Sequence, residues 1–362
     1  MNQQVNQKSP SAFSAWQLTV LVMMAGMGGM YFYPENFGRS SLALLVLTVV
    51  LTLLSMAMLS RTFGRSEALS FPALLREHTG DLPARIILTG AAVYFAAELS
   101  CVSVKLTHMT GFFLLEKTPS QIVLAVSLLT VCLLITSGIR QIARTAELLF
   151  LAIMLPLAFI MGMGLYSTNF GELLPLLKPN RFVIGQLPQS VMPLSGIAAT
   201  AYFAGYYNKK KLARSLLGGC AALAVFCVLI LLCCVGVFSV EGTRHLAFPL
   251  TELSRIVSVG NVSLNHRFDI LYMMIYTSVT LITGGILLYC CSISLCGVCH
   301  IKRHSCFHFL LLPVVFAVSY FSLSDDSIIR WAASWGKVFF LFLLIPLLYI
   351  ITTVKQIRRK AA

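Results

Sequence analysis

Charged side chains are scarce in this sequence of 362 residues, of which only 11% are Asp, Glu, Lys or Arg. A soluble domain carries about a quarter of such residues, so the composition excludes a water-soluble globular protein. The segments between the apolar runs are all too short to fold as separate domains. The apolar runs themselves are continuous rather than alternating, which disfavours a membrane β-barrel.

Hydrophobic residues are abundant in the sequence: they make up 58% of it, and the mean hydropathy is +0.85. Runs of about 20 apolar residues recur from end to end, and each is long enough to cross a bilayer as a helix. We predict an all-α integral membrane protein, a single transmembrane domain over residues 1–362 with ten helices. The predicted spans are residues 14–33, 40–60, 84–111, 119–138, 146–167, 187–207, 213–238, 268–297, 307–323 and 333–354.

The positive charge is spread along the chain rather than gathered in one patch. The formal net charge is +14, but the basic residues fall at the ends of the apolar runs, which argues against nucleic-acid binding. Lys and Arg favour the cytoplasmic ends of membrane spans. With the N-terminus inside, most of the 27 basic residues fall on the cytoplasmic side, so we expect both termini to be cytoplasmic.

Eleven cysteines are present, nearly all within apolar spans, where free cysteine behaves as a small hydrophobe. We therefore predict no disulfide framework. Cys296, Cys299 and His300 fit the pattern for covalent haem attachment, but the predicted topology places them on the wrong side of the membrane. A zinc site made of Cys296, Cys299, His304 and His308 is chemically possible and stays a minor alternative.

Two spans that lie five apart, the first and the sixth, carry helix-weakening residues near their middle. Glycine weakens a helix through backbone entropy, and proline removes a donor and clashes with the preceding turn. In lipid such breaks persist only where protein or a cavity satisfies the freed backbone groups. The candidate ligand-binding residues at the breaks are Gly26, Met27, Gly28, Gly29, Met192, Pro193, Ser195 and Gly196.

The matching positions of the breaks predict two inverted repeats of five helices, residues 14–167 and 187–354, with a ligand site at the membrane midplane. This is a LeuT-like arrangement with broken first and sixth helices. The alternative explanation is close helix packing, because glycine-rich faces also let helices approach one another.

Glu98 lies in the middle of the third span, where an ionisable group is costly and should face the bundle interior. Lys105 follows two helical turns later on the same face, and His108 three residues after that. Glu98 is therefore a carboxyl kept neutral by burial, a partner of Lys105, or a functional carboxylate. We include Glu98 and the nearby Tyr94 in the predicted ligand site. No catalytic set and no cofactor motif accompanies them, so we do not predict an enzyme.

Two short motifs follow the seventh span: residues 248–255 read Phe-Pro-Leu-Thr-Glu-Leu-Ser-Arg, and residues 267–269 read Arg-Phe-Asp at the start of the eighth span. With these motifs the segment resembles the B subunit of spore germinant receptors. Residues 173–175, Leu-Leu-Pro, are similar to a step that this family shows ahead of its sixth helix. The chain departs from the family at His266, where glutamate is usual, and at Glu172, where asparagine is common.

The resemblance implies a ten-helix fold of the amino acid–polyamine–organocation type and a nutrient-binding role in the spore inner membrane. It also implies two partners, a receptor A subunit and a lipoprotein C subunit. The favoured hypothesis is a receptor subunit that binds a small amino acid at the two breaks. The alternatives are a proton-coupled amino acid transporter that uses Glu98, and a structural scaffold that has lost ligand binding.

Overall fold

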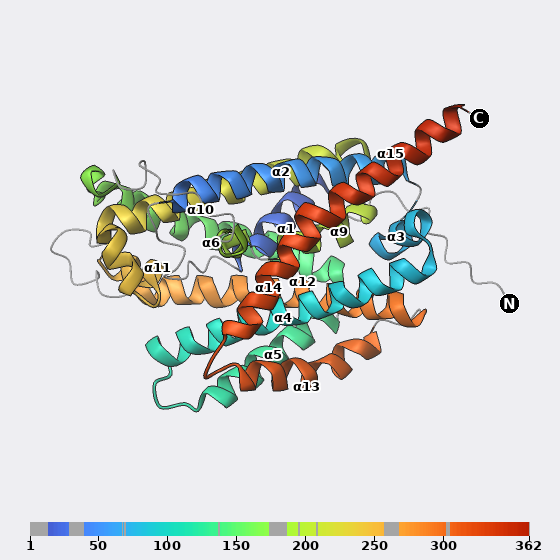
Figure 1. The fold of residues 1–362 in the computed structure, drawn as a ribbon. Helices are drawn as coiled ribbons and strands as arrows, with labels where there is room; N and C mark the ends of the chain where they lie inside the picture. The colour runs from blue at the N-terminus through green and yellow to red at the C-terminus, as the bar shows by residue number, and fades with distance from the viewer. Residues whose placement is uncertain are drawn as a thin grey trace.

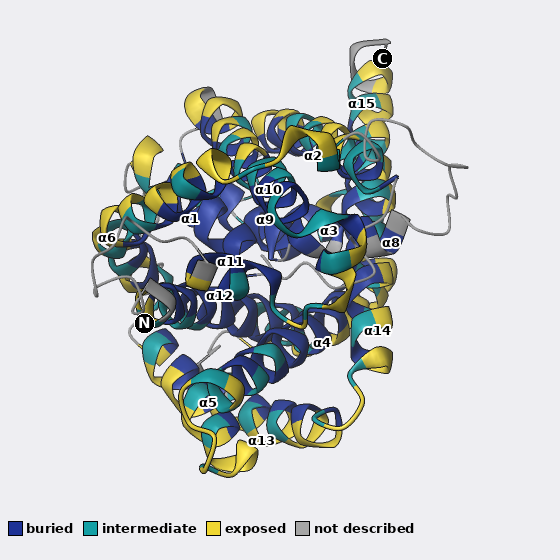
Figure 2. Cartoon of the chain, turned by 90° about the vertical axis from the view of Figure 1, so that its left-hand side faces the viewer, coloured by how far each residue is buried: buried dark blue, intermediate teal, exposed yellow. Residues whose placement is uncertain are grey.

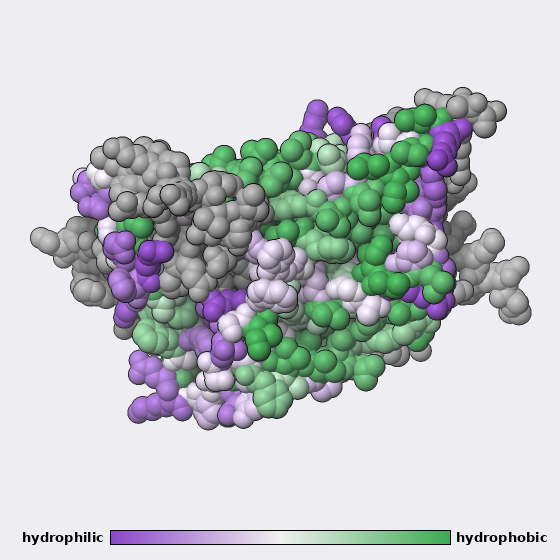
Figure 3. All heavy atoms as spheres, in the orientation of Figure 1, coloured by the Kyte–Doolittle hydropathy of each residue, from purple (hydrophilic) through white to green (hydrophobic). Residues whose placement is uncertain are grey.

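The computed structural model describes residues 14–28, 40–66, 68, 70–136, 138–173, 187–194, 196–207, 209–256, 268–301 and 305–361. All regular secondary structure in these ranges is helical, as predicted. Hydrophobic side chains cover the middle of the face seen in Figure 3, and hydrophilic ones gather towards its two ends. A multi-pass membrane protein is expected to show this distribution, because the middle faces hydrocarbon and the ends face water.

Six of the described helices are long and apolar enough to cross a membrane. They are α2 (Ser41–Arg65), α4 (Asp81–Phe113), α6 (Ile139–Tyr166), α10 (Lys209–His245), α12 (Phe268–Cys299) and the rod formed by α14 (Ser327–Val338), the π-helix η8 (Phe339–Leu344) and α15 (Ile345–Ala361). Three shorter apolar helices are α1 (Ala15–Met27), α5 (Ser120–Thr136) and α13 (Ser305–Phe321). These nine elements correspond to nine of the predicted spans.

The first span is broken where its glycines predict. Ser14 begins α1 with a capping box, in which its hydroxyl accepts from the backbone of Gln17 and the Gln17 side chain accepts in return. The helix ends at Met27 after 13 residues. At 1.5 Å per residue it is about 20 Å long, which is shorter than the roughly 30 Å of a bilayer's hydrocarbon core. Helix α1 is therefore too short to cross a bilayer on its own.

The sixth span is broken more thoroughly, because none of its helical pieces exceeds four residues. The pieces are α8 (Leu187–Ser190), the 3₁₀ turns η4 (Met192–Leu194) and η5 (Ile197–Ala199), α9 (Thr200–Phe203) and the 3₁₀ turn η6 (Ala204–Tyr206). Gly196, between η4 and η5, has a φ of +63°, a conformation that favours glycine. We call residues 187–206 the sixth-span segment.

Helix α12 runs through the centre of the bundle, where it packs against α4, α5, α6 and α1 (Figures 1 and 2). Helices α5 and α13 lie at the rim, with exposed side chains on their outer faces. Helix α1 packs closely against α10, because a Cβ on Gly219 would lie 2.9 Å from the carbonyl oxygen of Thr19. The broken elements are thus held inside a ring of continuous helices.

The connecting segments contain helices that the sequence patterns did not indicate: α3 (Phe71–Thr79), η2 (Phe170–Leu173) and α11 (Pro249–Ile256). Ser70 caps α3, and the fully buried Phe71 packs against Tyr202 and Phe340, with ring centroids 5.0 and 5.3 Å away. The Lys355 ammonium donates to two carbonyls at the C-terminal end of α3. Helix α3 therefore closes one end of the bundle.

Candidate functional site at the helix breaks

The two broken spans meet backbone to backbone. A Cβ on Gly196 would lie 2.2 Å from the carbonyl oxygen of Ala25, so only glycine leaves room for this approach. Ala25 is three residues before Gly28, which follows the last helical residue of α1. The glycine of one break therefore lies against the carbonyl groups of the other. Gly28 and Gly196, both predicted for the ligand site, therefore lie at one place in the fold.

A hydroxyl from α12 lies at the same point. The Thr283 Oγ1 donates to the carbonyl oxygen of Met24 at 2.8 Å, and a Cβ on Gly28 would lie 2.1 Å from that hydroxyl. Sequence reasoning missed Thr283, although a threonine before two glycines in the middle of an apolar span was a usable signal. The hydroxyl satisfies a carbonyl near the helix end, as a break inside lipid requires.

The other residues predicted at the breaks have different contacts or lie outside the described ranges. Gly26 faces α10, where a Cβ would meet the Leu223 side chain at 2.0 Å, so this glycine serves helix packing. Met27 is buried, and the carbonyl of Pro193 accepts from the Cys227 thiol at 3.8 Å. Two further predicted residues, Gly29 and Ser195, and the side chain of Met192 lie outside what the structure describes.

The end of α1 gives this place a partial negative charge. Aligned peptide dipoles leave roughly half a negative charge on the unsatisfied carbonyls at the C-terminal end of a helix. Met27 is that end, and the bundle buries it. In lipid, where no bulk water screens the carbonyls, they favour a cation or an ammonium group.

The partner of Glu98 is Lys337 and not Lys105. Glu98 is 2% exposed and Lys337 fully buried, and the Lys337 Nζ lies 3.1 Å from the Glu98 Oε1. Lys105 instead lies 3.7 Å from a carboxylate oxygen of Asp326, and the His108 ring is 3.0 Å from the carbonyl of Leu323. The structure therefore contradicts the alternative that pairs Glu98 with Lys105. Both side chains do lie on one face of α4, but that face is covered by α14 and the segment just before it.

Glu98 lies at the depth of the breaks. A Cβ on Gly284 would lie 3.4 Å from the side chain of Leu99, which places the residue after Glu98 against the residue after Thr283. Helix α12 thus carries Thr283 next to the end of α1 and Gly284 next to α4. The end of α1 and the Thr283 hydroxyl therefore lie at the same level of α12 as the turn of α4 that carries Glu98.

Tyr94 links the ion pair to the sixth-span segment. It lies one turn before Glu98, and its ring packs against Phe95 and Phe340, with centroids 4.8 and 6.2 Å away. Phe95 in turn meets Tyr202 of α9 edge-on at 5.3 Å. An aromatic cluster therefore connects α4 and η8 to the segment that follows Gly196.

The cysteines and histidines near the end of α12 do not form a metal centre among the described residues. His308 is buried and shares a hydrogen bond of 2.7 Å with the Ser292 hydroxyl, while Cys299 is exposed. His304, the fourth candidate ligand, lies outside the described ranges.

Comparison with known families decides what kind of membrane protein this is. The sequence profile of the family described as "Spore germination protein", the spore permeases, matches residues 14–328. The chain belongs to this family. The resemblance to germinant receptor B subunits, noted at residues 248–255 and 267–269, is thereby confirmed at the level of the family. Both the family and the fold are those of permease-like proteins.

This spore germination protein is 26% identical over 238 residues to the spore germination protein YndE of Bacillus subtilis (strain 168). The match covers 62% of this chain and 61% of YndE, which is less than two thirds of the relative's length. It is also similar in structure to MhsT, solved in complex with L-phenylalanine, with a TM-score of 0.67 at 13% identity. That similarity covers 96% of this chain and 99% of MhsT, and the predicted LeuT-like fold is confirmed.

Proposed function

We propose that this spore germination protein is a germinant receptor subunit that binds a small amino acid inside the membrane and takes part in triggering germination. One observation carries the proposal: the end of α1 and Gly196 meet at the middle of the bundle, beside the Thr283 hydroxyl. The breaks are what a midplane ligand site needs, because they leave backbone groups without helical partners.

The chemistry of the breaks favours a zwitterion. The carbonyls that end α1 suit an ammonium group, while the N–H groups that follow Gly196 suit a carboxylate. The bound L-phenylalanine of MhsT supports the choice of an amino acid, since the two chains share a fold.

The assembly around this subunit follows from the same proposal. The partners are a receptor A subunit and a lipoprotein C subunit, in the spore inner membrane. Both termini are cytoplasmic, and the two five-helix repeats, residues 14–167 and 187–354, enclose the site. The subunit senses its ligand without a cofactor and without catalysing a reaction.

A proton-coupled amino acid transporter is the second candidate, and the burial of Glu98 favours it. A transporter moves its ligand across the bilayer, whereas a sensor only binds it. Uptake of a radiolabelled amino acid into vesicles that contain the purified chain, driven by a pH gradient, supports the transporter. Binding without uptake supports the receptor.

The test of amino acid binding is thermal unfolding of the purified full chain with each of the twenty L-amino acids. We expect one or a few small ones to raise the unfolding midpoint, because a ligand that binds only the folded state stabilises it. Thr283→Val, which keeps the volume but removes the hydroxyl, should abolish that shift. Thr130→Val on the exposed face of α5 is the matched control and should keep it. A chain that no amino acid stabilises contradicts the proposal.

A further inference from the structure

Glu98 and Lys337 are the two Asp, Glu, Lys or Arg side chains that are buried within the described residues. Every other charged contact along the interface of α4 with α14 is more exposed, including Lys105–Asp326 and Arg330–Asp326. A pair of charges buried in a membrane costs desolvation that their attraction hardly repays. Two apolar side chains of similar volume would pack α4 against α14 equally well. The charges therefore call for a role beyond packing.

A carboxylate that serves ion-coupled transport needs a counter-ion that binds and is released during the transport cycle, such as a proton or a metal cation. The counter-ion of Glu98 is different, because it is an ammonium group attached to the backbone of α14, 3.1 Å away. No diffusing cation is needed to neutralise this carboxylate.

The local backbone holds the ammonium in this position. The π-helix η8 begins two residues after Lys337, and such wide turns are frequent at functional sites. Phe340 of η8 packs against Tyr94, and a Cβ on Gly336 would lie 2.6 Å from the same ring. The residues on both sides of Lys337 are thus fixed against the turn of α4 that precedes Glu98.

We propose that Lys337 is a positioning residue of the ligand site, whose tethered ammonium is the permanent counter-ion of Glu98 and makes ligand binding independent of any mobile cation. The proposal deepens the proposed function, on which its ligand-binding part rests. The subunit keeps the depth and fold of an amino acid site, but its buried carboxylate needs no exchangeable cation, which suits a sensor rather than a symporter.

The first test needs no ligand and measures the unfolding midpoint of the purified full chain between pH 5 and pH 8. In Lys337→Met, the folded state should take up a proton at Glu98 that the unfolded state releases, so the midpoint should fall as pH rises. Glu98→Gln should show the opposite slope, because the isolated Lys337 gives up a proton that the unfolded state retains. The double variant and Lys337→Arg should show neither slope.

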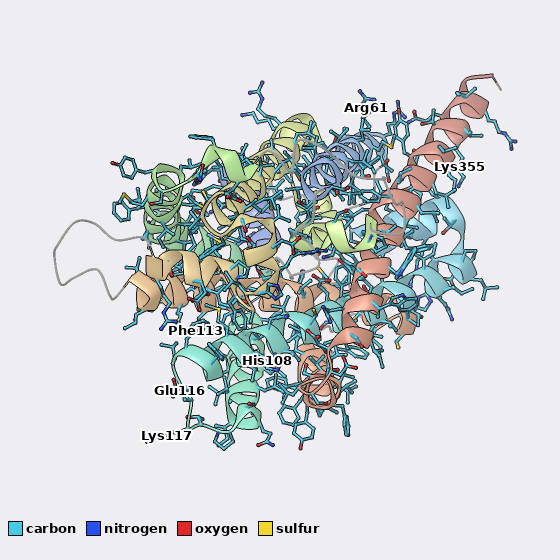
Figure 4. All side chains as sticks on the ribbon, turned by 60° about the vertical axis from the view of Figure 1, so that its left-hand side comes forward. Arg61, His108, Phe113, Glu116, Lys117 and Lys355 are labelled. Carbon is cyan, nitrogen blue, oxygen red and sulfur yellow. The ribbon has the colours of Figure 1, made fainter. Side chains whose placement is uncertain are left out.

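Other titratable groups lie near the pair, so each slope is measured against Lys117→Met, a control in the exposed loop between α4 and α5 (Figure 4). These groups are Tyr94 and Cys101 on α4, Tyr202 on α9 and Cys290 on α12, with Lys105, His108, Asp326 and Arg330 farther along the α4–α14 interface. None of these residues is substituted in any of the variants. We expect the two single variants to differ from this control by several degrees across the range, in opposite directions.

The second test measures binding of the amino acid that raises the unfolding midpoint most in the screen described above. Wild-type affinity should not change when Na⁺ is replaced by choline or when the pH is lowered from 8 to 5.5. Lys337→Met should bind more weakly as pH rises, by up to about tenfold per pH unit, the most that one proton produces. Lys337→Arg should restore the flat profile.

Two results overturn the inference: wild-type binding or stability that depends on Na⁺, or a Lys337→Met profile that matches the Lys117→Met control. If no amino acid binds, the proposed function fails, while the unfolding slopes still decide whether Lys337 is the counter-ion of Glu98. If Lys337→Met does not fold, the slope of Glu98→Gln and the Na⁺ dependence of the wild type decide it.

Discussion

At the scale of single residues, the buried ion pair of Glu98 and Lys337 joins α4 to α14. Glu98→Gln keeps the shape of the side chain but leaves Lys337 charged and buried. We expect it to lower the free energy of unfolding by roughly 3–5 kcal/mol, as when one partner of a buried pair is removed. Denaturant unfolding in detergent measures this, with the exposed Glu116→Gln as the control.

Adding Lys337→Met to Glu98→Gln should recover most of that loss, because no unpaired charge is then left in the bilayer. Adding Lys105→Met should recover none, since Lys105 lies against Asp326. A Glu98→Gln variant within about 1 kcal/mol of the wild type would instead mean that Glu98 is a neutral acid.

The depth of Glu98 could be predicted from the sequence, but its partner could not. The third span shows that Glu98 is buried in a helix, and the spacing to Lys105 follows from helical periodicity. The sequence also shows that Lys337 lies within a predicted span, residues 333–354. That α14, out of nine other spans, covers this face of α4 depends on tertiary packing, which no local pattern encodes. The same is true of Thr283 and the end of α1.

At the scale of elements, close packing of α1 against α10 holds the broken first span in place. Gly219 and Gly218 are neighbours on α10, but only Gly219 faces α1. Gly219→Leu should lower the free energy of unfolding by about 3 kcal/mol through overpacking. This is the upper end of the usual range, because the added side chain would meet the backbone of α1, which cannot easily move aside.

The matched control is Gly218→Leu, where a Cβ would meet nothing within 4 Å. It should be neutral or gain up to about 1 kcal/mol, because leucine is a better helix former than glycine. The difference between the two unfolding midpoints, measured in the same detergent, checks the prediction. Equal midpoints would mean that α1 does not pack on this face of α10.

Breaks and spans were predictable because glycine, proline and apolar length act locally. The sequence located the ends of α1 and the interruption at Gly196, and it ended the seventh span one residue before Ser239, whose φ of +64° interrupts α10. Helices α3 and α11 were missed because they are short and depend on tertiary contacts, such as Phe71 in the aromatic cluster. The π-helix η8 has no sequence signal in its apolar stretch.

At the scale of the whole molecule, charge sets the orientation in the membrane. Arg61 and Lys355 lie at one end of the molecule, and Glu116 and Lys117 lie towards the other (Figure 4). The excess of Lys and Arg predicts that the first of these ends is cytoplasmic. In a chain without native cysteines, a membrane-impermeant thiol reagent applied to intact cells should label Glu116→Cys and spare Arg358→Cys.

Both of these positions are exposed, so accessibility to the reagent depends on the side of the membrane alone. Permeabilised cells serve as the control and should show labelling at both. Labelling of Arg358→Cys but not Glu116→Cys in intact cells would reverse the topology. The fold and the site would stand, but the loop between α4 and α5 would face the cytoplasm.

The central claim is that a small amino acid binds where the end of α1 meets Gly196, and one measurement tests it most directly. Equilibrium binding of the radiolabelled amino acid found in the thermal screen is compared between the wild type, Gly28→Leu and Gly90→Leu. Gly28→Leu fills the break, whereas a Cβ on Gly90 would meet nothing within 4 Å. Folding of each variant is checked by its unfolding midpoint. We predict saturable binding by the wild type and Gly90→Leu and none by a folded Gly28→Leu; normal binding by Gly28→Leu would contradict the account.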